Sequence, residues 1–419
     1  MKLLHTSDWH VGKAIRGHSR AGEHRAVLAE ISSIAAAAEV DLVVVAGDLF
    51  DTAAPTAESE RIVYDALLAL ADTAPVVVIA GNHDNARRLD AVSRLLALGR
   101  VTVSTAPRAP ADGGVVELDL GGVRVRVALL PFVSQRAIIR AKALMDEAAF
   151  RNAQTYSERL QAVLGALTSG FTGDAVNLVV AHAFVAGGVV GGGERAAHLV
   201  EEYAISAVDF PATASYVALG HLHRPQVVAG ATAIHYCGSP LQLDFGEQAD
   251  PKQVNVVTAQ PGLPAKVTPV VLDSGRQLLT VSGTVDDLRA QAEQRGDELA
   301  AAWLRVRVAE PSRAGLADEV RAVLGDSVVD VRVDVAAEPG PRRRRRDDSR
   351  SPSQLFADYL DERQVVDARL QRTFDALHDE LYHPADVEPD PGGSIPAGPP
   401  ADAVPADDRL AVEQLSFER

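Results

Sequence analysis

The sequence predicts an α/β protein: a four-layer α/β/β/α sandwich, then a small βαβαβ capping domain and a C-terminal helical arm. Three observations support this fold class. Apolar runs alternate with helical segments over the first hundred residues, strands of alternating polarity follow from Val115, and a new strand–helix rhythm begins near Leu278. At 419 residues, the chain is long enough for two or three domains.

The first hundred residues carry the signals of a parallel sheet. Continuous β-branched runs such as "DLVVVA" and "VVVIA" are typical of strands buried on both faces. Helical segments separate them, as parallel strands require. The expected strands are 3–6, 41–46 and 76–80, and the expected helices are 23–38, 57–71 and 85–98.

From residue 115 the pattern predicts a second sheet. "VVELDL" and "VRVRVALL" form a hairpin joined at Gly121-Gly122, and a long helical stretch is expected over about 135–167. Further strands are expected at 176–181, 216–219, 233–236, 254–258 and 267–272. Two facing sheets with outer helices fit this order and give a first domain over 1–275.

The next segment, 276–338, reads as a separate capping domain. Strand, helix, strand, helix and strand follow one another as "LLTVSGT", "VDDLRAQAEQ", "AWLRVRVA", "AGLADEVRAVL" and "VVDVRVDV". Thr284, Asp286 and Asp287 supply an N-cap and an acidic first turn for its first helix. The unit is therefore expected to be a compact βαβαβ fold.

The C-terminal part divides into linker, helices and tail. Residues 339–351 form an Arg-rich linker, and 352–383 a helical arm with an N-cap at Ser351 and a proline at Pro352. The arm carries an apolar stripe at positions 355, 356, 359, 360, 366, 370, 374, 377 and 381. Two short helices cannot bury such stripes on each other alone, so either a partner or the chain's own first domain must cover them. The proline-rich tail, 384–419, is expected to be disordered.

Composition limits the class of protein. No apolar run reaches the roughly 18 residues of a membrane span, and His5 and Asp8 come too early for a signal peptide. The single cysteine, Cys237, excludes an internal disulfide and is typical of a cytoplasmic protein. The net charge of −16 argues against coating nucleic acid by bulk charge, although a nucleic-acid enzyme with local basic groups is compatible with it.

Side chains that can bind metal follow the strands at their carboxyl ends. They lie in "DWH" (8–10), "GDLFD" (47–51), "GNHD" (81–84), His182 and "GHLH" (220–223). Each segment alone is as well explained by a hydrogen-bonded turn. Because ligands bind at the carboxyl ends of strands in open α/β sheets, the ordered recurrence predicts one shared metal centre.

The donor types indicate two ions. Mixed carboxylate, imidazole and carboxamide ligands suit Mn²⁺, Fe²⁺ or Zn²⁺ better than Mg²⁺ or Ca²⁺. The set exceeds the needs of one ion, and a pair about 3.5–4 Å apart can clamp both oxygens of an in-line phosphoryl displacement. One carboxylate must bridge the pair. Asp48, in the middle of the set and preceded by Gly47, is the best candidate.

The motifs resemble those of the calcineurin-like metallophosphoesterases. Within them, "HTSDWHVGK", "GDLFDTAAP", "GNHD", "GHLHRPQ" and above all "GSPLQLDFGE" (238–247) are similar to the SbcD family, the nuclease subunits of bacterial SbcCD exonucleases. The resemblance covers 1 to about 275 with specific motifs, extends less sharply to about 383 and excludes the tail. It implies a phosphodiester hydrolase that digests double-stranded DNA ends 3′ to 5′ and cleaves single strands and hairpins in DNA repair, recombination and replication.

The resemblance also implies roles for individual residues. One metal, expected to be Mn²⁺, would be held by Asp8, His10, Asp48 and His223, and a second by Asp48, Asn82, His182 and His221. His83 would face the scissile phosphate and support the leaving group, and the carboxylate of Asp51 would orient His83. Some relatives carry His in place of Asp51. Asp84 is expected to bind backbone or a nearby Arg instead of metal.

The implied partners are DNA and an ATPase. The resemblance predicts a heterotetramer-type complex with SbcC, an SMC-like coiled-coil ATPase on which the helical arm docks, and a homodimer through the nuclease domain. The chain contains no G-x-x-x-x-G-K-[ST] motif, so dependence on ATP hydrolysis would come from that partner.

Several other polar residues have two interpretations. His5 and His235 lie inside strands and are either core side chains or neighbours of the metal centre. A basic group after the first motif either contacts phosphates or belongs to a solvated loop and helix start; it consists of Arg16, His18, Arg20, His24 and Arg25. The run 342–346 touches DNA or is a plain linker.

Two rival functions remain open on residues alone. A small-substrate metallophosphoesterase, such as a cyclic-nucleotide phosphodiesterase or protein phosphatase, would use the same centre. Against it, Asp51 is followed by Thr52 and Ala53 instead of the Arg-Gly of phosphoprotein phosphatases. A non-catalytic scaffold is the second rival, and the complete ligand set argues against it.

Overall fold

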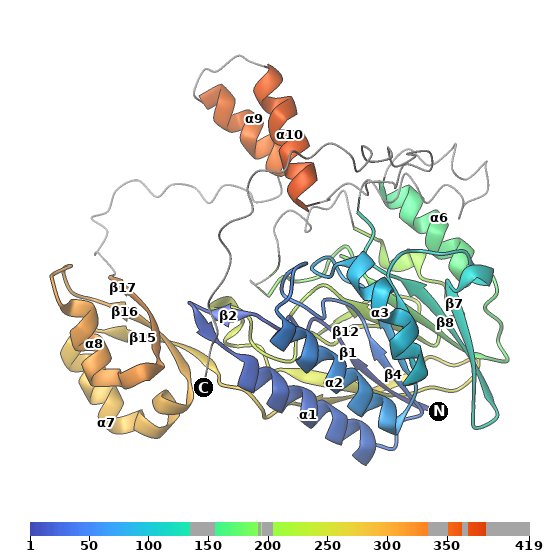
Figure 1. The fold of residues 1–419 in the computed structure, drawn as a ribbon, viewed down its shortest axis with the longest axis horizontal. Helices are drawn as coiled ribbons and strands as arrows, with labels where there is room; N and C mark the ends of the chain where they lie inside the picture. Colours follow the sequence, from blue (N-terminus) through green and yellow to red (C-terminus); the bar gives the residue numbers. More distant parts are fainter. Residues whose placement is uncertain (135–155, 192–193, 195–203, 334–350, 363–367, 383–419) are drawn as a thin grey trace, which may run out of the picture.

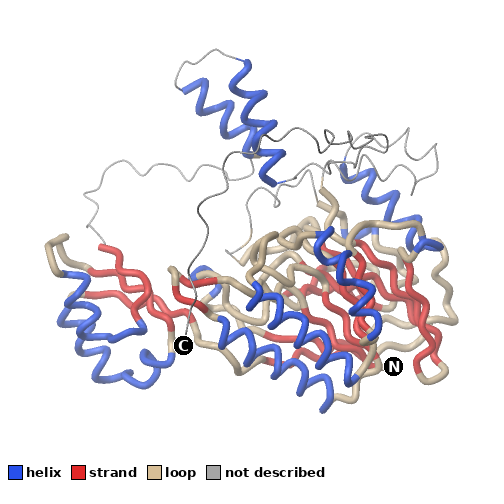
Figure 2. Tube along the Cα trace, in the orientation of Figure 1, coloured by secondary structure: helices blue, strands red, loops and turns tan. Residues whose placement is uncertain are grey.

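The computed structural model describes the chain except for residues 135–155, 192–193, 195–203, 334–350, 363–367 and 383–419. Its larger part has two six-stranded sheets, with helices over the outer faces (Figures 1 and 2). Buried aliphatic side chains, including Val44, Val77, Leu129 and Val180, fill the space between the sheets. The predicted four-layer α/β/β/α sandwich is confirmed.

The first sheet has the order β14-β13-β1-β4-β5-β6. Its strands are β1 (Lys2–Thr6), β4 (Leu42–Val45), β5 (Val76–Ile79), β6 (Val101–Ser104), β13 (Gln253–Thr258) and β14 (Lys266–Val271). β1, β4, β5 and β6 run parallel, whereas β13 and β14 pair antiparallel. Helices α1 (Ala21–Ala37), α2 (Ala57–Thr73) and α3 (Ala86–Leu98) pack on its outer face through a second core. Burial on both faces explains the continuous valine runs of β4 and β5.

The second sheet has the order β11-β12-β10-β9-β8-β7. Its strands are β7 (Val115–Leu120), β8 (Val123–Leu130), β9 (Val176–His182), β10 (Tyr216–Gly220), β11 (Gln226–Val228) and β12 (Ala233–Tyr236). Helix α6 (Tyr156–Thr168) covers its outer face with Leu160 and Leu164. β8, β9, β10 and β12 are parallel. Both sheets therefore present several carboxyl strand ends, which is where the sandwich places its polar motifs.

Some local predictions differ from the structure. α6 is described over Tyr156–Thr168, within the long helix expected over 135–167, and the rest of that expected helix lies outside the described residues. The short strands β2 (Ala14–Ile15), β3 (His18–Ser19), β6 and β11 were not predicted. These strands lack a continuous apolar run. β6 and β11 lie at sheet edges and β2 pairs only with β3, so pairing with a neighbour creates them.

A small three-stranded sheet follows, at the left of Figure 1. It pairs β15 (Leu278–Gly283), β16 (Trp303–Val308) and β17 (Val328–Val333) in parallel, with α7 (Val285–Ala301) and α8 (Leu316–Leu324) supplying its separate core. Thr284 and Asp287 form the capping box that starts α7. The expected βαβαβ order is present, and the exact domain limits remain a prediction.

The C-terminal helices form a hairpin. In α9 (Pro352–Glu362) and α10 (Ala368–Tyr382), the rings of Phe356 and Phe374 stack 4.2 Å apart. Ser351 caps α9 by accepting from the Gln354 amide at 3.2 Å. The linker run 342–346 and the tail 384–419 lie outside the described residues. In the part of the chain that is described, no helix is both long and apolar enough to cross a membrane.

Candidate metal centre

The polar motifs converge because two loops run side by side at the end of the first sheet. The Asp8 amide donates to the Gly47 carbonyl at 2.9 Å, and the His10 amide donates to the Asp48 carbonyl at 3.0 Å. The His221 amide, from the end of β10 in the second sheet, donates to the Asp8 carboxylate at 2.9 Å. These bonds bring the motifs after β1, β4 and β10 into one site.

The backbone at this site is strained. Asp8, His10, Asp48 and His221 have φ values of 53°, 45°, 51° and 105°, in the left-handed region. Each such residue costs on the order of 1–3 kcal/mol and persists only where the surrounding structure enforces it. The concentration of these residues at one point indicates a site that is built for function.

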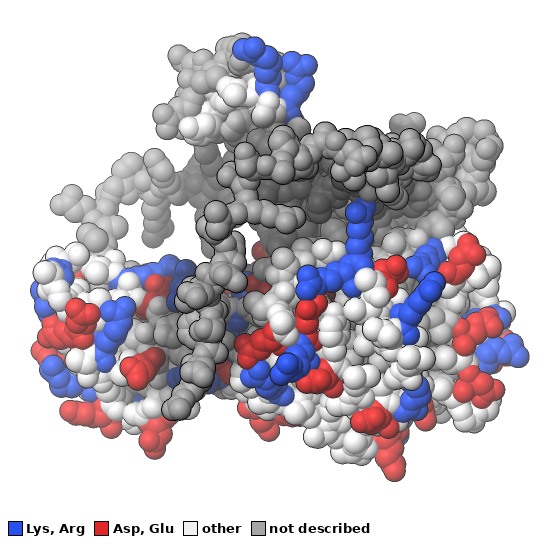
Figure 3. All heavy atoms as spheres, viewed as in Figure 1, with Lys and Arg blue, Asp and Glu red and all other residues white. Residues whose placement is uncertain are grey.

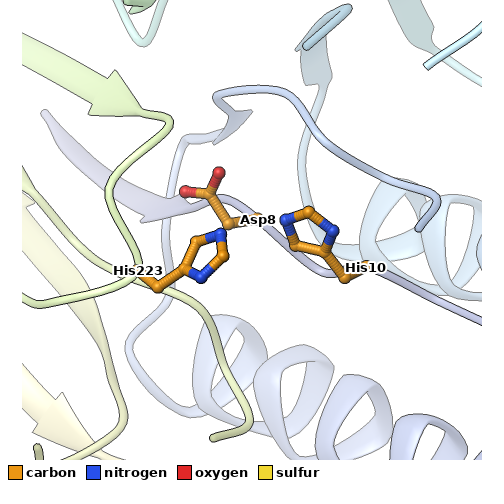
Figure 4. Close-up of side chains that lie close together, drawn as sticks. All are labelled: Asp8, His10 and His223. Atoms are coloured by element: carbon orange, nitrogen blue, oxygen red, sulfur yellow. The ribbon is translucent and has the colours of Figure 1, made fainter. Parts of the chain in front are cut away.

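One half of the site groups a carboxylate with two imidazoles. Ligand atoms of Asp8, His10 and His223 lie within 4.8 Å of one another, and all three residues are buried. Figure 4 shows their side chains close together, with Asp8 and His10 on the loop after β1 and His223 on the loop after β10. A carboxylate and two imidazoles at this separation can hold one divalent ion.

The other half is arranged around Asn82. Its Oδ1 lies 2.9 Å from Nε2 of His182 and 2.9 Å from Nδ1 of His221. Asp48 lies between the halves, since its Oδ2 is 3.5 Å from Nε2 of both His10 and His182. The structure thus brings together all the residues expected to hold metal, and Asp48 has the central position.

The electrostatics of the centre suit cations. Both ring nitrogens of His10 are buried with no hydrogen-bond partner among the described residues. Burial raises the pKa of Asp8 to about 6, although His182 and His223 oppose it. Burial would lower the pKa of His182, but the Asp48 carboxylate, together with Asp8 and the bond to the Ala46 carbonyl, raises this pKa to about 9. A proton on His182 stabilises negative charge in the centre, which a divalent metal would do more strongly. The residues therefore fit two such ions.

His83 lies beside the centre and is held through its backbone. Its amide donates to Asp48 Oδ1 at 2.8 Å, and its ring is 4.6 Å from that of His10. Nδ1 of His83 donates to the main-chain carbonyl of Asp51 at 2.7 Å. The Asp51 carboxylate instead faces Nδ1 of His10 at 3.5 Å and Nζ of Lys13 at 3.2 Å. The orienting contact seen for His83 is thus the carbonyl of Asp51, where the carboxylate was expected.

Asp84 acts on backbone, as predicted. Its carboxylate accepts from the amides of Leu49, Phe50 and Gly81 at 3.2, 3.0 and 2.9 Å. These bonds join the turn after β4 to the turn after β5. Asp84 thereby holds the segments of Asp48 and Asn82 together.

The residues with two interpretations mostly have structural partners. His5 Nδ1 lies 2.9 Å from the Tyr216 hydroxyl inside the core, and Nδ1 of His24 bonds to the Arg20 carbonyl. The arginines of the basic group form ion pairs: Arg16 with Asp330, Arg20 with Glu23, and Arg25 with Glu58. These contacts favour the structural interpretation over phosphate binding.

Sequence reasoning missed two groups at the site. Glu247, the last residue of "GSPLQLDFGE", is fully buried against His223, and its signal was the motif itself. Phe132 lies with its ring centroid 6.4 Å from that of His221, with the ring planes inclined by 23°. It follows β8 in "LLPFVS", where nothing local distinguishes it from a core residue.

A two-sheet sandwich with a His/Asp/Asn centre that fits two metals, at the carboxyl ends of its strands, defines a metal-dependent phosphoesterase. A profile of the family described as calcineurin-like phosphoesterase matches residues 1–225. The SbcD subunit of the SbcCD nuclease of Bacillus subtilis (strain 168) is 36% identical over 316 residues, covering 74% of this chain and 80% of that protein. The Escherichia coli (strain K12) protein of the same name is 30% identical over 324 residues, covering 74% and 78%. The chain belongs to the SbcD family of calcineurin-like phosphoesterases.

Proposed function

We propose that this chain is a metal-dependent nuclease, the subunit of an SbcCD-type complex that hydrolyses DNA phosphodiester bonds. The observation that carries the proposal is the convergence of the whole donor set, with His83 beside it, in a member of the SbcD family. Relatives in that family are named as the SbcD subunit of the SbcCD nuclease. We further propose 3′ to 5′ digestion of double-stranded ends, cleavage of single strands and hairpins, and a cytoplasmic location.

The metals are assigned to the two halves of the centre. Asp8, His10, Asp48 and His223 would hold the first, and Asp48, Asn82, His182 and His221 the second, with Mn²⁺ as the proposed ion. When bound, such a pair stabilises the charge that develops on phosphoryl oxygens during an in-line displacement. Asp48 serves both halves because its carboxylate faces His10 and His182 at equal distance.

His83 is the proposed proton-transfer residue. Because its Nδ1 donates to the Asp51 carbonyl, its Nε2 is the ring atom that would exchange a proton with the leaving oxygen. The His83 amide donates to Asp48, and a ring nitrogen of His83 lies within 4.8 Å of ligand atoms of His10 and Asp48. These contacts support a ring next to the centre, to which we assign proton transfer and not metal binding. Lys13 forms an ion pair with the Asp51 carboxylate at 3.2 Å beside the site and balances its negative charge.

The test compares two variants in a Mn²⁺-dependent nuclease assay on hairpin and double-stranded DNA, with and without the ATPase partner. His83→Ala should keep both metals and lose about 10²–10⁴-fold in rate. Asp48→Ala should lose metal as well as activity. Parallel loss of metal and activity in His83→Ala would show that the ring is a ligand. Failure of the wild type to release nucleotides from DNA, with hydrolysis of small phosphodiesters retained, would favour the small-substrate function.

We propose that the helical arm docks on a coiled coil of the ATPase partner. With Phe356 and Phe374 stacked on each other, Leu355, Tyr359 and Leu377 still expose about half of their side chains. A hairpin with such an uncovered apolar face requires another surface. Truncation after Arg350 should abolish co-purification with the ATPase while preserving Mn²⁺-dependent cleavage of single-stranded DNA. A truncated chain that binds the ATPase at full affinity would place the docking surface elsewhere.

We propose a homodimer through helices α2 and α3. Leu68, Leu95 and Leu98 are 44%, 69% and 85% exposed. Leu68 lies beside the end of α3, because a Cβ on Gly99, next to Leu98, would lie only 2.7 Å from Leu68, and Leu95 precedes Leu98 by three residues, which places both on the same side of α3. Leu98→Asp should convert the dimer to monomer in sedimentation velocity, whereas Leu263→Asp, at an exposed loop leucine, should not. An unchanged dimer in Leu98→Asp would contradict this assignment.

A further inference from the structure

The segment 238–252 encloses His223 from several sides. Glu247, which is fully buried, places Oε1 at 3.1 Å from Nδ1 of His223. Its Oε2 accepts from Nζ of Lys252 at 2.7 Å and from the Leu243 amide at 3.0 Å. Both oxygens of the carboxylate are thus used, one on the His223 ring and one on the segment itself.

Lys252 completes this network. Its side chain is only 7% exposed, and its ammonium group also donates to the His223 carbonyl at 3.1 Å and to the Ser239 hydroxyl at 2.9 Å. The Ser239 amide donates to the same His223 carbonyl at 3.1 Å. A buried carboxylate is costly without a cation, and Lys252 supplies it. The ring and the main-chain carbonyl of His223 are therefore held by one charge-balanced unit, whereas the His223 amide donates to Glu194 at 2.9 Å.

The same segment is anchored to the small sheet. Phe245 packs with Ile15, Leu278 and Trp303, and the Asp244 carboxylate accepts from the Gly246 amide at 2.8 Å. These contacts fix the short turn that carries Glu247. The motif "GSPLQLDFGE" thus has a physical purpose, since each of these contacts contributes to the position of one carboxylate.

The contact determines which nitrogen of His223 carries the proton. A carboxylate paired with Lys252 accepts and does not donate, so Nδ1 of His223 must be protonated. The lone pair then lies on Nε2, the atom available to a metal. His182 is arranged differently, because its Nδ1 donates to the neutral carbonyl of Ala46 at 2.8 Å.

We propose that Glu247 is a positioning residue that fixes the tautomer and orientation of the His223 ring and strengthens it as a metal ligand, with Lys252 balancing its charge. A carboxylate behind a histidine ligand raises the basicity of the ring and typically changes metal affinity by about 10–100-fold when it is removed. The inference rests on the proposed metal assignment of His223. Beyond that assignment, it gives Glu247 a role in metal binding that it performs through His223 and without binding the metal itself.

The first experiment titrates the metal-free protein with Mn²⁺ by calorimetry. Glu247→Gln should bind Mn²⁺ about 10–100-fold more weakly at one site and normally at the other. Glu310→Gln is the matched control, because Glu310 is a partly buried carboxylate of the small domain that accepts from the Val285 amide at 2.6 Å and, among the described residues, makes no hydrogen bond to segment 238–252. Two unchanged affinities in Glu247→Gln would overturn the proposal. Wild-type protein that binds two Mn²⁺ but cleaves no DNA would instead contradict the proposed nuclease.

A second variant separates positioning from folding. Glu247→Gln leaves Lys252 unpaired, so the double variant Glu247→Gln/Lys252→Met restores charge balance. It should melt near the wild type in the metal-free state and still show the weakened site. Normal affinity at both sites in a well-folded double variant would refute the role of the carboxylate.

A spectroscopic measurement on the wild type requires no stable variant. The ¹⁵N shifts of the His223 ring in the metal-free protein, assigned by comparison with His223→Asn, report which nitrogen bears the proton. We expect the Nδ1–H tautomer. A ring protonated only at Nε2 would overturn the proposal even if every Glu247 variant failed to fold.

Discussion

Gly81 is the position where one added methyl group should do most damage to the centre. It lies in the turn after β5, directly before Asn82, and its amide donates to Asp84 at 2.9 Å. A Cβ at this position would lie 2.7 Å from Cγ of Asp48 and still closer to the amide and one carboxylate oxygen of that residue. Distances under 3.0 Å are essentially never found for a real Cβ. Gly81→Ala therefore forces the turns after β4 and β5 apart.

The size of the effect follows from these contacts. Ordinary carbon contacts begin near 3.5 Å, so Asp48 must retreat by roughly 1 Å. Overpacking of this kind costs about 1–3 kcal/mol of stability, and each kcal/mol lowers Tm by about 2–4 °C in a domain of this size. A displacement of about 1 Å at a reacting centre costs about 10²-fold in rate. Because Asp48 faces both halves of the centre, Gly81→Ala should weaken both metal sites together.

The assay combines Mn²⁺ calorimetry, thermal melting of the metal-free protein and the nuclease rate. Gly22→Ala is the control, since a Cβ on Gly22 in α1 meets no atom within 4 Å. It should leave metal binding unchanged and, as a helical Gly→Ala change, should not lower stability. Wild-type affinity for two Mn²⁺ in Gly81→Ala would refute the argument that Asp48 is held by this close approach.

Three further predictions concern protons, the domain junction and DNA. Mn²⁺ binds the neutral ring of His182, whose pKa is raised to about 9, and the ionised carboxylate of Asp8, whose pKa is about 6. Between pH 6 and pH 9 the His182 ring must therefore lose a proton when metal binds, and the affinity for Mn²⁺ should rise about tenfold per pH unit. Calorimetry in buffers of different ionisation enthalpy should count about one released proton, and pH-independent affinity would contradict it. Glu23 in α1 accepts bonds from the Trp303 ring and the Arg276 amide at 2.9 and 2.8 Å, which join the first domain to the small domain. Glu23→Gln weakens these bonds, so the free energy of unfolding from calorimetric melting should fall by about 1–3 kcal/mol. An unchanged melting curve would show that these bonds do not stabilise the contact between the two domains. Acidic and basic side chains are interspersed on the face in Figure 3, and the net charge is −16. A plot of log Kd for DNA against log salt concentration should therefore have a slope well below about ten. A slope near ten would show that this chain alone neutralises many phosphates.

Much of the fold was predictable because its signals are local. The valine runs of β4 and β5 require burial on both faces, which in turn requires helices outside and a second sheet inside. The polar motifs meet in one site because parallel strands bring their carboxyl ends together. Asp84 was predicted to act on backbone, and it does.

Other features depend on residues far apart in the chain, and only the tertiary structure decided them. The edge strand β6 forms because it pairs with β5 by parallel backbone hydrogen bonds, and its four residues alone do not predict a strand. Asp51 was expected to act through its carboxylate, yet backbone geometry after β4 turns its carbonyl to His83 and its side chain to His10. The burial of Glu247 behind His223 follows from the return of the chain through the segment that packs on the small sheet. The sequence determines which side chains are present and the period at which apolar residues recur. The hydrogen-bond partner of each buried polar atom depends on how distant segments of the chain pack together.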